Sequence, residues 1–211
     1  CKECASQLSP FFSERRHSTV AEISDQLAWR EANKERVAQF NVTRTLGNDT
    51  KVLLDEDAQR FLVTTGGRWR DANPDVLDFS QVTGCDTEIR ESRSELHWTD
   101  DDGEEHSYEP PRYDVDYDMY LTIHVNTPYF DEITFKINDY RIEERMSVEF
   151  REAERQAGEI RDALTAVRQG VRDAAAEAAK PKVAQTCPFC GATTSPDASG
   201  RCEYCGGAMG A

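Results

Sequence analysis

Hydrophobic and polar residues alternate along much of the middle of the chain, and this period of two predicts antiparallel strands. The clearest case is YDVDYDMYLTIHV, where every odd-numbered residue from 113 to 125 is apolar. EITFKIN repeats the alternation, and KVLLD and RFLVTT are short apolar runs joined by the turn EDAQ. Several such strands, each with one buried face, predict a small antiparallel sandwich or barrel.

Helical periods flank these strands on both sides. Thr19 and Glu22 have the spacing of a capping box and begin a predicted helix over residues 20–40. Near the other end, apolar residues step by three and four from Phe150 to Ala174, which predicts a helix from about 147 to 178.

The second predicted helix is long for one small sheet, about 45 Å at 1.5 Å per residue. Its first half is expected to cover the sheet. Its second half, with Leu164, Val167 and Val171, is expected to extend beyond the sheet and present an apolar seam. Two alternatives remain for the surface that covers this seam. One is a second copy of the chain, which would give a weak homodimer, and the other is the N-terminal helix of the same chain.

The terminal segment TCPFCGATTSPDASGRCEYCGG holds two CxxC pairs, which predict one metal site with four ligands: Cys187, Cys190, Cys202 and Cys205. Four thiolates suit Zn²⁺, with bonds of about 2.3 Å, and a closed four-cysteine site has no open position for water. The sequence therefore predicts a structural zinc ribbon. Phe189 and Tyr204 are expected to pack over the metal. A redox role for CPFC is disfavoured, because a second CxxC lies close by.

A third CxxC pair, Cys1 and Cys4, supplies half of another metal site. We expect its remaining ligands upstream, in a further CxxC. His17 is a candidate third ligand, but its place before a helix is typical of a surface or capping residue. The seventh cysteine, Cys85, lies on the apolar face of a predicted strand and is expected to be a small buried residue. Paired spacing with an odd total favours metal binding in a reducing compartment over a disulfide framework.

Charge is unevenly distributed along the chain. The net charge is −15, and residues 41–146 hold 25 acidic against 11 basic residues. Such a surface repels nucleic-acid phosphates and anionic lipid headgroups and favours a basic protein partner, a cation, or solubility alone. No apolar run is long enough to cross a membrane. The acidic loop around Gly103 resembles a calcium-binding loop, but Trp98 occupies the first ligand position, so a solvated hairpin turn is expected.

Two classes of function remain. The first is a non-enzymatic adaptor or scaffold that binds proteins through its acidic β-rich domain. The alternative is an enzyme whose site is assembled from scattered residues on one sheet face, namely Asp114, Asp116, Asp118 and His124. No nucleotide-binding loop or nucleophile motif occurs, so we favour the adaptor.

The chain resembles a family of uncharacterised bacterial cytoplasmic proteins with an N-terminal four-cysteine zinc domain of unknown function. The resemblance rests on LSPFFSERRHSTVAEI, FNVTRTLG, NPDVLDFSQVTGC, PPRYDVDYDMYLTIHVNTPYFDEI and the two terminal CxxC pairs. It implies zinc and a cytoplasmic setting, and it matches Cys1 and Cys4 to the second half of the N-terminal zinc site. It supplies no activity and no catalytic residues.

Together these patterns predict an α+β fold, whose strand-rich unit closed by a C-terminal helix resembles a bacterial pleckstrin-homology-like domain. The expected divisions are a remnant of the N-terminal zinc domain (1–17), a helix (18–40), the β-rich domain with its long helix (41–178), a linker (179–186) and the zinc ribbon (187–211).

Overall fold

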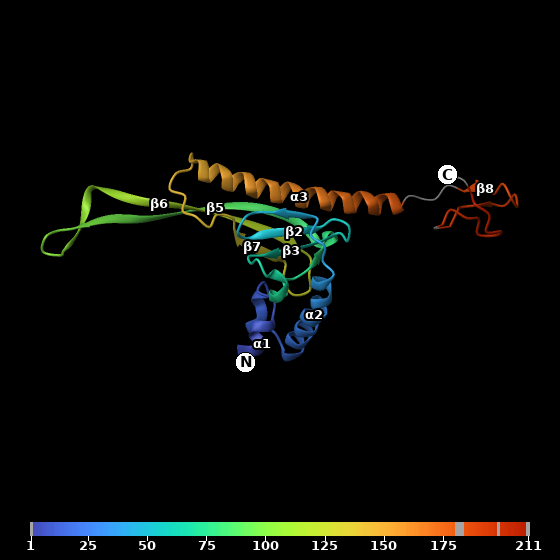
Figure 1. Ribbon diagram of the computed structural model, residues 1–211, viewed down its shortest axis with the longest axis horizontal. Coiled ribbons are helices and arrows are strands. Elements are labelled where there is room, and N and C mark those ends of the chain that lie inside the picture. The colour runs from blue at the N-terminus through green and yellow to red at the C-terminus, as the bar shows by residue number, and fades with distance from the viewer. Residues whose placement is uncertain (1, 180–183, 198, 210–211) are drawn as a thin grey trace. The chain divides into compact units, whose positions relative to one another are not determined.

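The computed structural model describes residues 2–179, 184–197 and 199–209, without the side chains of residues 2–4. The chain divides into two compact units, Cys1–Val171 and Arg172–Ala211. Helices and antiparallel strands are both present, which confirms the α+β class (Figure 1). No described sheet is closed on itself.

The first unit contains two open antiparallel sheets. Four strands form one sheet in the order β1-β2-β3-β4: β1 (Arg44–Leu46), β2 (Lys51–Asp55), β3 (Arg60–Thr64) and β4 (Leu77–Asp78). Three strands form the other in the order β5-β6-β7: β5 (Val82–Thr99), β6 (Glu105–Val125) and β7 (Glu132–Lys136). The predicted hairpin is confirmed, because residues 56–59, the EDAQ turn, join β2 to β3.

The helices of the first unit are α1 (Lys2–Gln7), α2 (Val20–Ala38) and the long α3 (Val148–Ala179), within which the division between the units falls. Three short 3-10 helices connect them and the strands: η1 (Ser13–Arg16), η2 (Trp69–Ala72) and η3 (Phe79–Gln81). The capping box is confirmed at the start of α2. The Glu22 N–H donates to the Thr19 hydroxyl at 3.3 Å, and the Thr19 N–H donates to the Glu22 carboxylate at 2.7 Å.

One hydrophobic core lies between the two sheets. Leu54 and Phe61 from the first sheet and Leu121 and Ile123 from the second are fully buried in it, together with Ile160 of α3. The opposite face of the first sheet packs against α2 in a second cluster, formed by Val37, Phe40, Leu53, Leu62 and Val76. Strands β2 and β3 are therefore buried on both faces, which explains their continuous apolar runs.

The apolar stripe of α3 belongs to the same core, which corrects the expectation of an exposed seam. Leu164 is fully buried, and Val167 and Val171 pack against the core of the first unit. The helix packs into a core shared by both sheets, so it has more surface to cover than the single small sheet assumed from sequence. The seam therefore gives no support for a homodimer.

Strands β5 and β6 extend well past the core and form a two-stranded arm (Figure 1). Strand β7 pairs with β6 only from Tyr120 to His124, and within β5 only Val82 is buried. The alternation in β6 correctly predicted a strand, but the apolar face of its outer half is not covered. Tyr113, for example, is 55% exposed.

Candidate metal centre

The second unit is built around two cysteine turns with the same backbone geometry. The carbonyl of Cys187 accepts the Gly191 N–H at 2.9 Å, and the carbonyl of Cys202 accepts the Gly206 N–H at 2.8 Å. Both glycines have positive φ, 71° and 69°, a conformation that other residues adopt only with strain. The short strands β8 (Gln185–Thr186) and β9 (Thr193–Thr194) pair beside the first turn.

These turns bring the four predicted sulfur ligands together. The Sγ atoms of Cys187 and Cys205 lie 3.6 Å apart, those of Cys190 and Cys202 lie 3.7 Å apart, and all four lie within 4.8 Å of one another. These distances are too long for a disulfide, whose sulfurs are about 2.05 Å apart. A tetrahedral ion with four bonds of about 2.3 Å holds its sulfurs about 3.8 Å apart. The cluster therefore fits a single tetrahedral metal ion.

The pKa values of the cysteine thiols also fit a site for a cation. Burial has the largest effect on Cys187 and raises its pKa, but the backbone N–H groups of Cys190 and Phe189 and the neighbouring thiols outweigh it and lower the pKa to about 7. For Cys205 the Gly207 N–H lowers the pKa, whereas the thiols of Cys190 and Cys187 raise it, to about 12 overall. The Cys187 thiol thus ionises near neutral pH, and ionisation of the Cys205 thiol beside it is opposed. A bound cation would hold all four as thiolates.

The aromatic residues inside the CxxC turns do not pack over the cluster as predicted. Phe189 is 71% and Tyr204 74% exposed, because the middle residues of each turn point outward. The Phe189 ring lies against the opposite turn, where a Cβ atom added to Gly207 would come within 2.6 Å of it. The module therefore presents two aromatic side chains to solvent. Its own small core consists of Cys187, Cys202 and Met209.

The front half site lies outside the described side chains. Cys1 is not described, and Cys4 is described only by its backbone within α1. His17 is exposed at the end of η1, where its N–H donates to the Glu14 carbonyl at 2.8 Å, as expected for a surface or capping residue. The Cys1 and Cys4 site stays a prediction.

The aspartates of β6 that form its acidic face interact with other residues of the same chain. Asp114 pairs with Arg141, Asp118 pairs with Lys136, and Asp116 accepts the Ile142 N–H at 3.2 Å. His124 bonds to Asp86 at 2.8 Å, from its Nε2 atom, and lies near Glu132 instead of near the aspartates. Six residues of strand separate His124 from Asp118, a distance of about 20 Å. The structure thus does not assemble these residues into one site.

A second group of possible ligands, Asp100, Glu104 and His106, lies at the end of the arm. Sequence reasoning assigned this loop to a hairpin turn, which the pairing of Thr99 with Glu105 confirms. The Asp100 carboxylate organises that turn. One of its oxygens accepts the N–H groups of Asp102 and Glu104 at 3.0 and 2.9 Å, and the other lies 2.6 Å from His106 Nε2. These bonds also lower the pKa of Asp100, His106 contributing most.

A cavity of about 350 Å³ lies between the N-terminal segment and the sheets, with Phe11, Arg30, Asp75 and Phe135 in its wall. The charged side chains in its wall pair with each other. Arg30 pairs with Asp75, and Ser9 donates to the same carboxylate at 2.5 Å. The cavity therefore offers a ligand little beyond apolar contact.

No protein-family model, curated protein or solved structure matches the chain. Among the helices of the described residues, none has both the length and the apolar character to cross a membrane.

Proposed function

We propose that this protein is a zinc-binding adaptor, in which the terminal four-cysteine module and the acidic β-rich unit bind other proteins. The observation that carries the proposal is the spacing of the four sulfur atoms, which suits one ion bound by four protein ligands. Such a closed site stabilises a fold and leaves no coordination position for a substrate. Zinc is the ion proposed, because four thiolates in a tetrahedral arrangement are its usual structural site.

Metal analysis tests the zinc proposal. Freshly purified wild-type protein is expected to contain zinc, and a Cys187→Ser, Cys202→Ser variant is expected to lose one equivalent. Cys85→Ser is the matched control and is expected to keep the full zinc content, because Cys85 lies in β5 of the first unit. Equal zinc in all three proteins, or a different metal in the wild type, would contradict the proposal.

The adaptor role is supported by what the two units expose. The terminal module presents Phe189 and Tyr204 to solvent, and aromatic residues are enriched where proteins bind one another. The alternative, an enzyme using Asp114, Asp116, Asp118 and His124, has no comparable support, since these residues are separately engaged.

Reconstitution tests the adaptor. A partner that co-purifies with the native protein should bind the purified chain at fixed stoichiometry, and Phe189→Ala, Tyr204→Ala should weaken that binding. The proposal fails if no purified partner binds the purified chain.

Three further parts of the proposal rest on resemblance. We infer a pleckstrin-homology-like fold for the first unit, supported by a four-stranded and a three-stranded sheet that share one core with a C-terminal helix. A fold of this kind is a scaffold and does not define a ligand. We also propose membership of the uncharacterised bacterial zinc-domain family and a cytoplasmic setting, where reduced thiols remain available to zinc.

A further inference from the structure

The arm formed by β5 and β6 differs in charge between its inner and outer parts. We call residues 86–93 and 112–120 the arm shaft and residues 94–111 the arm tip. In the shaft, most carboxylates have a cationic partner: Glu88 with Arg90, Glu91 with Arg93, Asp114 with Arg141, and Asp118 with Lys136. The shaft is therefore close to electrically balanced at short range.

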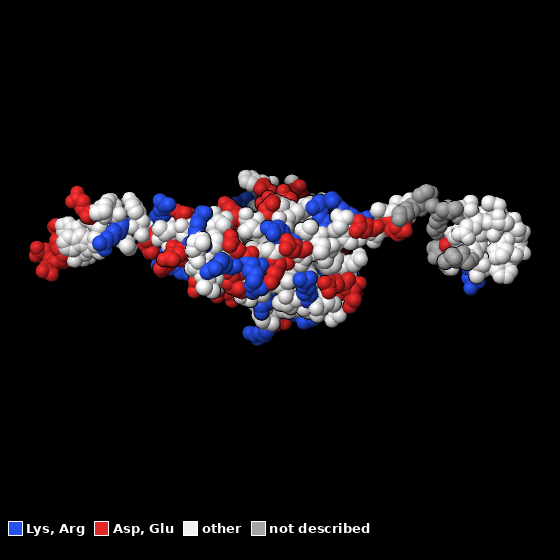
Figure 2. All heavy atoms as spheres, turned by 90° about the horizontal axis from the view of Figure 1, so that it is seen from above, with Lys and Arg blue, Asp and Glu red and all other residues white. Residues whose placement is uncertain are grey.

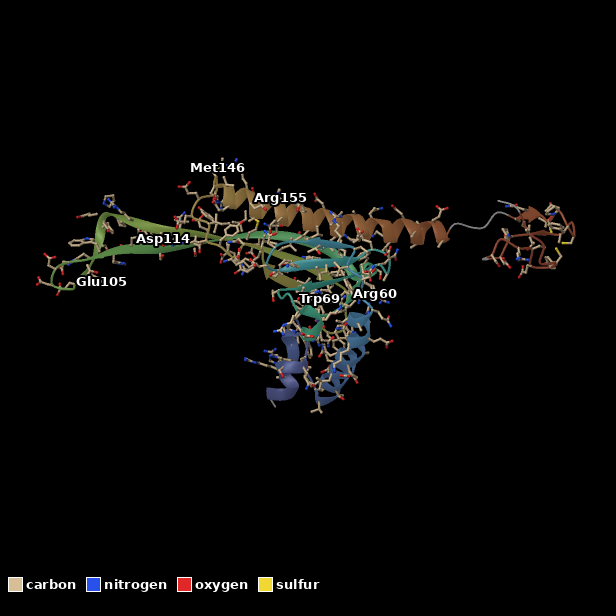
Figure 3. All side chains as sticks on the ribbon, viewed as in Figure 1. Arg60, Trp69, Glu105, Asp114, Met146 and Arg155 are labelled. Carbon is tan, nitrogen blue, oxygen red and sulfur yellow. The ribbon has the colours of Figure 1, made fainter. Side chains whose placement is uncertain are left out.

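The arm tip has no such balance. It holds seven acidic residues and no Lys or Arg: Glu95, Asp100, Asp101, Asp102, Glu104, Glu105 and Glu109. Within the described side chains, only Asp100 has a basic partner, the imidazole of His106. Figure 2 shows the acidic side chains gathered at the end of the arm, and Figure 3 places Glu105 there and Asp114 nearer the core. Nearly half of the net charge of −15 thus lies in 18 residues that the chain does not neutralise.

The tip is also ordered and partly apolar. The Asp100 carboxylate fixes the turn, and the rings of Trp98 and His106 stack across the strands with centroids 4.9 Å apart. Leu96 and Trp98, two residues apart in β5, are 42% and 44% exposed. An exposed tryptophan surrounded by charges is the composition of a protein-binding hot spot, and a preformed turn lowers the entropic cost of binding.

We infer that the arm tip is the docking element of the proposed adaptor and that its occupant is an Arg- or Lys-rich segment of another protein. This inference rests on the adaptor function proposed above. The carboxylates supply charge complementarity, and Trp98 offers a ring face on which a guanidinium or ammonium group binds. A second copy of the tip would bring seven more acids, and a nucleic acid would bring phosphates. Both are repelled.

Peptide binding tests the inference on the full-length, zinc-loaded protein. The probe is a fluorescent peptide of alternating Arg and Ala, and the control peptide has Gln in place of Arg. The tip variant carries Asp101→Asn, Asp102→Asn, Glu104→Gln and Glu105→Gln. The matched control variant removes the same number and type of charges from exposed positions elsewhere: Glu35→Gln, Glu56→Gln, Asp57→Asn and Asp71→Asn. Thermal unfolding confirms that both variants fold.

Wild type is expected to bind the Arg peptide, and the affinity should fall as ionic strength rises. The tip variant should bind about tenfold more weakly and the control variant less than about twofold more weakly, because only the tip charges act at short range. Trp98→Ala should weaken binding without changing its salt dependence.

Three results would overturn the inference. Equal losses in the tip and control variants would show attraction by net charge alone, and equal binding of the Gln peptide would exclude charge complementarity. Binding that appears only when Ca²⁺ is added to the zinc-loaded protein, and that the tip variant lacks, would assign the tip to the cation, through Asp100, Glu104 and His106. None of these would affect the adaptor proposal, which is tested by reconstitution with a natural partner.

Discussion

Arg30 and Asp75 show at the scale of single residues how distant parts of the first unit are held together. Arg30 belongs to α2 and Asp75 to the loop before β4, and both side chains are buried. Ser9, from the N-terminal segment, donates to the same carboxylate, and Arg30 Nε donates to the Gln7 carbonyl at 3.2 Å. The pair thus joins three segments that are remote in sequence.

Replacing Asp75 with Asn is expected to destabilise the first unit by about 3–5 kcal/mol, the usual effect of leaving one member of a buried ion pair without its partner. Chemical denaturation measures the loss, with Glu56→Gln as an exposed control that should change stability by less than about 0.5 kcal/mol. An Asp75→Asn variant as stable as the control would show that the ion pair is not needed to hold the three segments.

Cys85 is the one cysteine outside the CxxC pairs, and its surroundings make it unreactive. Cys85 is only partly buried, which corrects the expectation of a buried residue. This partial burial, and to a lesser extent Asp86, raise its pKa to about 11, against the lowering effect of Arg161. Since the thiolate is the reactive form, we expect Cys85 to react with iodoacetamide at neutral pH roughly 100-fold more slowly than an ordinary cysteine.

The rate should rise with pH up to about 11 as the thiolate forms. Peptide mapping by mass spectrometry after timed alkylation measures it, with a short cysteine peptide as the reference. Alkylation of Cys85 at the reference rate at pH 7.5 would show that the thiol is activated.

Residue-scale features were predictable from sequence where they are local. The four cysteines of the candidate metal site follow from two CxxC turns, since each turn sets its own geometry. The partners of Asp114 and Asp118 were not predictable, because Arg141 and Lys136 reach them from other segments. Without those partners, the sequence groups the three aspartates with His124 as one candidate site, whereas the carboxylates without a cationic partner gather at the arm tip.

Among the elements, the arm shows most clearly what a sequence period leaves undecided. Alternation identified residues 113–125 of β6, but alternation is the same whether or not another layer covers the apolar face. Met119, Leu121 and Ile123 are buried under that layer, and Tyr113 is not. The cover comes from the first sheet and α3, whose positions the sequence of β6 does not contain.

Shortening the arm is expected to leave the stability of the first unit almost unchanged. Joining Glu95 to Tyr113 through an Asn-Gly turn removes residues 96–112, none of which is buried. We expect a change in melting temperature of no more than about 2 °C, since the deletion exposes no core surface. Leu121→Ala, at the inner end of β6, should instead cost about 2–5 kcal/mol because it leaves a cavity. If the shortened protein melted at a temperature as low as that of Leu121→Ala, the arm would be part of the cooperative core.

The whole molecule combines two units stabilised by different means. The first buries a continuous core between two sheets and α3, whereas the described residues of the second form a core of only three, Cys187, Cys202 and Met209. A cluster of this size cannot offset the entropy of ordering the surrounding chain. We therefore expect the proposed metal to supply the stability of the second unit, since zinc binding by short peptides of this type contributes about 10–16 kcal/mol.

Chelation is consequently expected to unfold the segment around the four cysteines and to leave the first unit folded. A strong chelator should abolish the ordered NMR signals of residues 185–209 and leave the thermal transition of the first unit unchanged, because the two hydrophobic clusters share no residue. The Cys187→Ser, Cys202→Ser variant should give the same spectrum without chelator, which separates loss of the metal from other effects of the reagent. Loss of first-unit signals in both samples would mean that the units fold cooperatively. A tail that stays ordered in the variant would mean that its fold does not depend on the four-cysteine site.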